Sequence, residues 1–197
     1  MTKQILDIVG FLKLVLDALK AAHIDYLIGG AIAVWAYGEP RATQDIDIVI
    51  NLQVELIGKF SKELEKRDML VPAEIILDTL LEDRADIPIN AIHTHSGLKA
   101  DLYPIRSGDE LRLSAFQRRQ QVNYGPPIGR VYVHSPEDLL LYKLLYFSMS
   151  QQSKHSRDIA AILRAKENQL NLGYIEEWTA RLGLTSLWKE LLDSTKH

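Results

Sequence analysis

Cysteine is absent from this sequence of 197 residues. Disulfides and cysteine-ligated zinc are therefore excluded, and the lack of disulfides favours the cytoplasm. No apolar run approaches the roughly 20 residues that a membrane-spanning helix needs. The N-terminus carries Lys3 but has no continuous apolar segment and no small-residue cleavage site. We therefore expect a cytoplasmic protein with neither a membrane span nor a secretory signal.

A basic excess is also missing, since the formal net charge is −3. Proteins that wrap duplex nucleic acid through many phosphate contacts usually carry such an excess. Any polynucleotide contact would therefore need a local basic patch. The best candidate for that patch is a group of arginines that a solvated loop explains equally well: Arg112, Arg118, Arg119 and Arg130.

Helical and strand-like patterns alternate through residues 1–134, and the length suits one α/β domain or a catalytic domain with a small helical extension. We predict that Pro72 occupies the first helical position of its helix. The segments 87–92 and 98–105 should form an antiparallel hairpin around Gly97, and 107–121 is either helical or irregular. The predicted helices are 4–22, 31–37, 53–67 and 72–81, and the predicted strands are 24–28, 46–50, 87–92, 98–105 and 131–133.

From residue 135 onward the sequence becomes helical throughout. Ser135, Pro136 and Asp138 form a typical helix start, with the serine as N-cap and an acid in the third helical position. The predicted helices are 135–146, 157–166, 174–182 and 186–192. The sequence therefore predicts a mixed α/β (α+β) domain at 1–134, followed by a helical subdomain at 135–197.

Asp45 and Asp47 are the first residues that suggest chemistry. Side chains alternate along a strand, so these two carboxylates share one face while Ile46 and Ile48 occupy the other. Two neighbouring carboxylates repel each other, and Mg²⁺ removes that cost while keeping open positions for substrate phosphates. The alternative is a strand whose first residues simply lie in solvent.

Gly29 and Gly30 follow a predicted strand and open a short helix. Glycines at such a turn let the backbone approach a phosphate, and the helix N-terminus offers free N–H donors. A tight strand-to-helix turn explains the same pair. Arg41 and Thr43, in the loop before the acidic pair, either contact phosphate or fix the loop.

A third carboxylate is needed if two metal ions are to flank a phosphoryl centre. Asp101 is the favoured candidate because it lies in the middle of a predicted strand, and Asp86 is its competitor. His93 and His95 share a strand face and form an alternative metal site. We instead assign the two histidines to the exposed face of the hairpin, since no further ligand is near them in the sequence.

The run from Gly29 to Ile48 resembles the signature of the DNA polymerase β-like nucleotidyltransferase superfamily. It is most similar to a small bacterial branch that includes nucleotidyltransferase toxins of abortive-infection and toxin–antitoxin systems. That branch carries Gly-Gly, a later glycine and then Arg-x-Thr-x-Asp-Ile-Asp. The strict match covers about 20 of the 197 residues, and a looser one extends to about residue 165 through Lys143 and Arg157-Asp158. Classical members of the superfamily read Gly-Ser at this turn, whereas this sequence has Gly29-Gly30, which fits the small branch.

The resemblance implies a nucleotidyltransferase fold that moves a nucleoside monophosphate from a nucleoside triphosphate to an acceptor hydroxyl and releases pyrophosphate. It implies that Asp45, Asp47 and Asp101 are the catalytic residues and hold Mg²⁺ or Mn²⁺. Lys143 would contact the nucleotide, although a helix lysine with its head in solvent is an equal alternative. The implied nucleotide-binding residues are Gly29, Gly30, Arg41, Thr43 and Lys143.

Other functions remain open at this point. The acceptor is an RNA 3′ end, a protein or a small molecule. One alternative is a catalytically silent module that binds a nucleotide or a partner. Another is a toxin–antitoxin component that acts on a protein and pairs with a cognate antitoxin or toxin.

Overall fold

The computed structural model describes residues 6–38, 40–166 and 169–194. Within these ranges a six-stranded sheet has the order β3-β4-β2-β1-β6-β5. β2 runs parallel to β4 and β1 parallel to β6, while the other neighbours are antiparallel. The predicted mixed sheet, including the antiparallel hairpin, is therefore confirmed. The strands are β1 (Asp25–Ile28), β2 (Asp45–Asn51), β3 (Ile89–Ile92), β4 (Lys99–Pro104), β5 (Gln120–Asn123) and β6 (Arg130–Val133).

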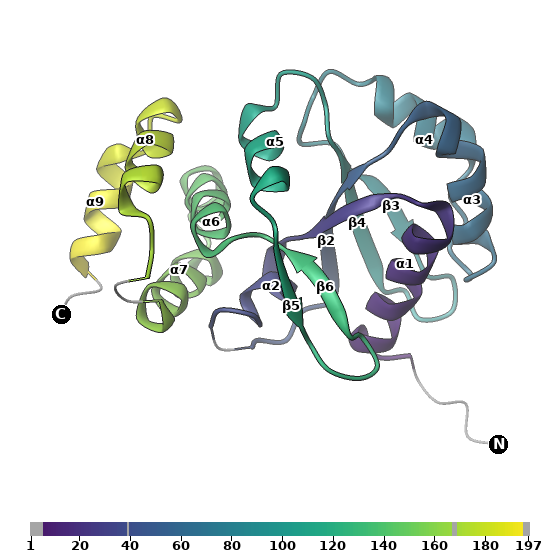
Figure 1. Ribbon diagram of the computed structural model, residues 1–197, viewed down its shortest axis with the longest axis horizontal. Helices are drawn as coiled ribbons and strands as arrows, with labels where there is room; N and C mark the ends of the chain where they lie inside the picture. The colour runs from purple at the N-terminus through teal and green to yellow at the C-terminus, as the bar shows by residue number, and fades with distance from the viewer. Residues whose placement is uncertain (1–5, 39, 167–168, 195–197) are drawn as a thin grey trace.

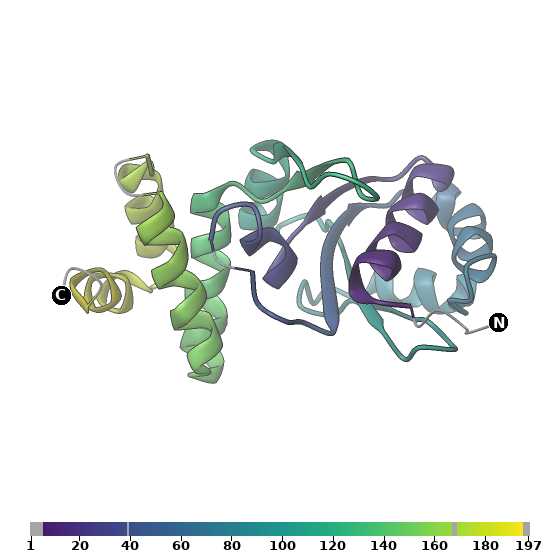
Figure 2. The ribbon, with the colours of Figure 1, turned by 90° about the horizontal axis from the view of Figure 1, so that it is seen from below.

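Helices flank this sheet (Figures 1 and 2). The first of them has Asp7 as its N-cap, whose side chain accepts a hydrogen bond from the Gly10 N–H at 2.7 Å. Residues 4 and 5 of the predicted first helix lie outside the described residues. The helices of this part are α1 (Ile8–Ala22), α2 (Gly30–Val34), the short 3₁₀ helix η1 (Val54–Leu56), α3 (Ile57–Glu65), α4 (Ala73–Leu81) and α5 (Glu110–Gln117).

The chain after β6 is helical and lies beside the sheet, at the end of the molecule away from α1 and α3 (Figures 1 and 2). Ser135 caps the first of these helices as predicted, because its Oγ accepts a hydrogen bond from the Asp138 N–H at 3.1 Å. The buried carboxylate of Asp138 also accepts a 2.6 Å hydrogen bond from the Tyr174 hydroxyl, which ties α6 to α8. The helices are α6 (Pro136–Ser150), α7 (Ser153–Ala165), α8 (Leu172–Arg181) and α9 (Thr185–Ser194).

Three sequence expectations are wrong in detail. Pro72 is the N-cap of α4 and not its first helical residue, because its ψ of 145° is extended. β5 begins at Gln120, inside the segment 107–121 for which the sequence predicts a helix or irregular structure. The polar residues of β5 show no strand-like alternation, so the sequence pattern does not reveal this strand. His93 is only 7% exposed and not on a solvent face, because its ring packs 6.2 Å from that of Phe11.

No helix in the described ranges is both long enough and apolar enough to cross a membrane.

Candidate active site

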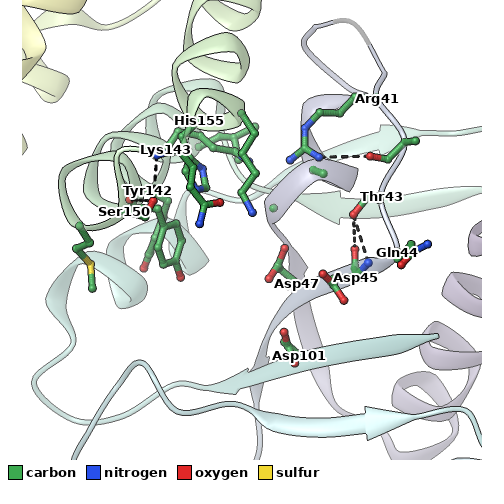
Figure 3. A pocket seen from close by; sticks show the side chains of 18 of the residues that line it. Arg41, Thr43, Gln44, Asp45, Asp47, Asp101, Tyr142, Lys143, Ser150 and His155 are labelled. Carbon is green, nitrogen blue, oxygen red and sulfur yellow. Dashed lines mark hydrogen bonds between the residues drawn. The ribbon is translucent and has the colours of Figure 1, made fainter. Parts of the chain in front are cut away.

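The two aspartates of β2 and the predicted third acid lie side by side. β2 and β4 are parallel neighbours, and their register places Asp47 directly opposite Asp101. Ile46 and Ile48 are fully buried on the other face of β2, so strand alternation holds Asp45 and Asp47 on the same face as Asp101. Figure 3 shows the three carboxylates grouped at one side of the pocket.

The surroundings of Asp47 disfavour the charged form of its side chain. Burial is the largest cause that raises the pKa of its carboxyl group. The ammonium of Lys143 opposes that rise, while the carboxylates of Asp101 and Asp45 add to it. A cation placed between the acids would relieve both the burial cost and the repulsion.

The residues present fit a divalent cation. Asp101 has one buried carboxylate oxygen, Oδ1, without a hydrogen-bond partner, and carboxylate oxygens are the ligands that Mg²⁺ prefers. Its other oxygen, Oδ2, lies 2.8 Å from the ammonium of Lys99. Among the described residues no three acidic or histidine side chains already surround one point as ligands. The competitor Asp86 is exposed and pairs with Arg84 at 2.8 Å.

The Gly29-Gly30 turn is pressed against Asp47. The Gly29 N–H donates a 2.8 Å hydrogen bond to the Asp47 carbonyl. Gly30 has a φ of +57°, and a Cβ at this residue would lie 1.8 Å from Asp47 Oδ2. On its other side the turn touches His134, whose ring would be 2.9 Å from a Cβ on Gly29. A serine therefore cannot replace Gly30 in this conformation, which explains the departure from the Gly-Ser pattern.

Asp158 of α7 organises the cations of the pocket. Its carboxylate accepts a 3.0 Å hydrogen bond from Arg41 Nε and lies 2.6 Å from the ammonium of Lys143. The side chains of Lys143 and Asp158 are each only 4% exposed. Burial alone would raise the pKa of Asp158, but the hydrogen bond from Arg41 and the charge of Lys143 outweigh it and lower that pKa. The sequence placed Asp158 within the looser resemblance without assigning it a role.

Thr43 and Arg41 both hold the loop before β2. The hydroxyl of Thr43 donates to the Asp45 carbonyl at 3.0 Å and accepts from the Asp45 N–H at 3.3 Å. Arg41 is held across the pocket by α7, through Asp158. In this state the two side chains fix the loop, which is one of the two roles that the sequence left open.

A cavity of about 770 Å³ separates the acids from α6 and α7. An aromatic wall, formed by Tyr142, Tyr146 and His155, lines it opposite the three aspartates. The rings of Tyr146 and His155 are stacked, with centroids 5.9 Å apart. Tyr142 is only 9% exposed and belongs to the hydrophobic core, whereas Tyr146 is 36% exposed.

Two of the four arginines in the candidate basic patch have partners within the fold. Arg112 is 5% exposed and donates to the Ala85 carbonyl at 2.7 Å. Arg118 pairs with Glu137 and Asp138 of α6. Both arginines therefore serve the fold, and neither is free to bind a polynucleotide backbone.

No protein-family model matches this sequence, and no curated protein matches it significantly. Solved structures do match. A crystal structure of ANT(2'')-Ia in complex with adenylyl-2''-tobramycin has a TM-score of 0.60 at 18% identity, over 91% of this chain and 98% of that one. The fold is that of a nucleotidyltransferase.

Two further structures agree on the fold. An antigenic nucleotidyltransferase-like protein from Paracoccidioides brasiliensis has a TM-score of 0.59 at 21% identity, over 94% of this chain and 91% of that one. The lincomycin-bound lincosamide antibiotic adenylyltransferase LnuA has a TM-score of 0.51 at 17% identity, over 77% of this chain and 93% of that one. At such identities the similarity establishes the nucleotidyltransferase fold, and the reaction must be argued from the site.

Proposed function

We propose that this chain is a metal-dependent nucleotidyltransferase, which moves a nucleoside monophosphate from a nucleoside triphosphate to an acceptor hydroxyl. The observation that carries the proposal is the register of β2 and β4. It groups Asp45, Asp47 and Asp101 on one wall of a cavity next to a glycine turn. Such a grouping is costly in a folded protein without a cation, and nucleotidyl transfer uses that cation.

Asp45 and Asp47 would hold the metal from β2, and Asp101 would hold it from β4. When bound, Mg²⁺ or Mn²⁺ supplies positive charge to the triphosphate and to the leaving pyrophosphate. Asp101 is also the base that accepts the proton of the acceptor hydroxyl. The acceptor oxygen bonds to the α-phosphorus, the bond to the bridging oxygen breaks, and pyrophosphate leaves.

Other residues position the nucleotide. The Gly29-Gly30 turn would lie close to the phosphates because it packs directly against Asp47, whose carboxylate fills the space that a Cβ on Gly30 would take. Lys143 of α6 and Arg41 of the loop before β2 line the same cavity and supply positive charge beside their shared partner Asp158. The stacked rings of Tyr146 and His155 offer the nucleobase a platform. In this proposal residues 1–134 are the catalytic domain, and residues 135–197 are a helical subdomain that contributes the lysine and the aromatic wall.

A second candidate is a catalytically silent module that binds the nucleotide without transferring it. The observation that favours it is the ion pair between Lys99 and Asp101, which occupies one oxygen of the proposed base. The two candidates differ in one measurable outcome, because only an enzyme produces a labelled acceptor.

The test is transfer of label from each of the four α-labelled nucleoside triphosphates. Purified protein is incubated with Mg²⁺ and a cell extract, which is then separated into RNA, protein and small-molecule fractions. The control is the double variant Asp45→Asn/Asp47→Asn. Label in one fraction, absent with the control, supports the proposal and identifies the acceptor class. Nucleotide binding without any transfer supports the silent module.

A further inference from the structure

A lysine lies inside the acid cluster. The register of β2 and β4 pairs Lys99 directly with Asp45, two residues before the Asp47–Asp101 pair, so Lys99 shares the face of the three carboxylates. Its ammonium lies 2.8 Å from Asp101 Oδ2. The lysine side chain is 35% exposed and that of Asp101 only 12%. The mobile end of the pair is therefore the lysine.

Lys99 is a charged partner at neutral pH. The hydrogen bond with Asp101 is the largest cause that raises the pKa of Lys99; partial burial opposes the rise, and the charges of Asp45 and Asp47 add to it. The cluster thus holds three carboxylates and one ammonium, and its local charge is smaller than that of the acids alone.

We propose that Lys99 is an internal counter-ion that competes with the divalent cation for Asp101, so that the cluster binds metal tightly only together with a nucleoside triphosphate. This inference rests on the proposed function. An ammonium and a divalent cation cannot share Asp101 Oδ2, because the two positive charges repel each other at contact distance. Free metal must therefore either displace Lys99 from Oδ2 or bind at the unpartnered Oδ1 beside the lysine's charge, and in both cases the ammonium weakens its binding.

The nucleotide changes this balance. A triphosphate brings negative charge next to the ammonium of Lys99. The attraction between lysine and phosphate then offsets the repulsion between lysine and metal. Metal and nucleotide then favour each other's binding, and this coupling is reciprocal in the two ligands. Lys99 in this role acts through Asp101 and is a positioning residue.

Equilibrium binding of Mn²⁺ alone, followed by electron paramagnetic resonance of the free ion, tests the inference. The variants are Lys99→Met, which keeps the stem and removes the charge, and Lys99→Arg, which keeps the charge. Lys66→Met is the matched control, because Lys66 forms a 2.5 Å pair with Glu63 on the distant α3. Lys99→Gln replaces Lys99→Met if the latter does not fold, as judged by its circular dichroism.

Lys99→Met is expected to bind free Mn²⁺ about three- to tenfold more tightly than the parent, the effect of one partly exposed charge pair. Lys99→Arg and Lys66→Met should stay within about twofold of the parent, since neither changes the cluster charge. A non-hydrolysable α,β-methylene nucleotide should tighten Mn²⁺ binding more in the parent than in Lys99→Met. Equal or weaker Mn²⁺ binding by Lys99→Met overturns the inference.

This experiment separates the two proposals. If Mn²⁺ binds the parent and is lost in Asp47→Asn, the metal site of the proposed function stands whatever Lys99→Met does. If neither the parent nor Lys99→Met binds Mn²⁺, with or without the nucleotide analogue, both proposals are overturned.

Discussion

Asp47 and Asp101 lie side by side on two adjacent parallel strands, where the half-buried Asp47 packs against the glycine turn and Asp101 pairs with Lys99. This grouping of the two carboxylates lowers the stability of the folded protein. Buried like charges lower the stability of the folded state, and a ligand that neutralises them recovers the difference.

Asp47→Asn should reduce nucleotidyl transfer without lowering the stability of the protein at pH 7. Because burial raises the folded-state pKa of Asp47 above its unfolded value, the carboxyl group favours folding when protonated. That contribution is lost as the pH rises through the folded-state pKa. In metal-free buffer at pH 7 the variant should therefore be at least as stable toward urea as the parent, and this advantage should vanish below about pH 4. Nucleotidyl transfer should fall by about 10²-fold or more. A variant clearly less stable than the parent at pH 7 would contradict this account of Asp47.

Gly30→Ala should disrupt the turn more than an alanine at another glycine of similar conformation. Gly30 and Gly97 both have positive φ, at +57° and +72°, but only Gly30 has Asp47 in the space of a Cβ. Gly97→Ala should lower the free energy of unfolding by about 1 kcal/mol through strain alone. Gly30→Ala should lower it by at least about 1 kcal/mol more. Chemical denaturation of both variants measures the difference, and equal losses would show that the contact with Asp47 is relieved without cost.

Asp158→Asn should destabilise the protein because it leaves Lys143 buried and without its charged partner. The expected loss is about 3 kcal/mol at pH 7. Since the pKa of Asp158 is lowered in the folded state, its contribution is present above the unfolded pKa and is lost as the pH falls through the folded value. The difference from the parent should therefore shrink below about pH 4.

An exposed ion pair provides the control for Asp158. Asp17 lies 2.5 Å from Lys13 on α1, and its side chain is 39% exposed. Asp17→Asn should change stability by no more than about 0.5 kcal/mol, because solvent screens such pairs. Urea unfolding across the pH range measures both variants. Losses of equal size would show that burial around Asp158 carries no special weight.

Tyr146→Ala should weaken nucleotide binding, since it removes one ring of the stacked pair with His155. Loss of a base-stacking ring corresponds to about a tenfold rise in the nucleotide dissociation constant. Tyr146→Phe keeps the ring and should bind within about twofold of the parent. Calorimetric titration with the α,β-methylene nucleotide reads this directly. If the alanine variant binds as tightly as the phenylalanine variant, the base lies elsewhere.

Local periodicity explains which features could be predicted from the sequence. The shared face of Asp45 and Asp47 follows from strand alternation, and the helix start at Ser135 follows from its cap. The pairing of β2 with β4, which brings Asp101 beside Asp47, depends on contacts between distant segments. The contacts of Asp158 with Arg41 and Lys143 likewise join distant segments, and they arise only when the helical part packs against the loop before β2. Lys99 and Asp101, by contrast, are two residues apart on β4, so strand alternation already places them on one face.

Attack on the α-phosphorus can be distinguished from other phosphoryl transfers by the position of a label. The acceptor fraction identified by the four-nucleotide assay is incubated with Mg²⁺, the protein and one nucleoside triphosphate, labelled at either the α- or the γ-phosphate. We expect α-label to enter the acceptor, γ-label to appear only in pyrophosphate, and Asp45→Asn/Asp47→Asn to abolish both. γ-Label in the acceptor, or equal transfer by the double variant, would contradict the proposed function.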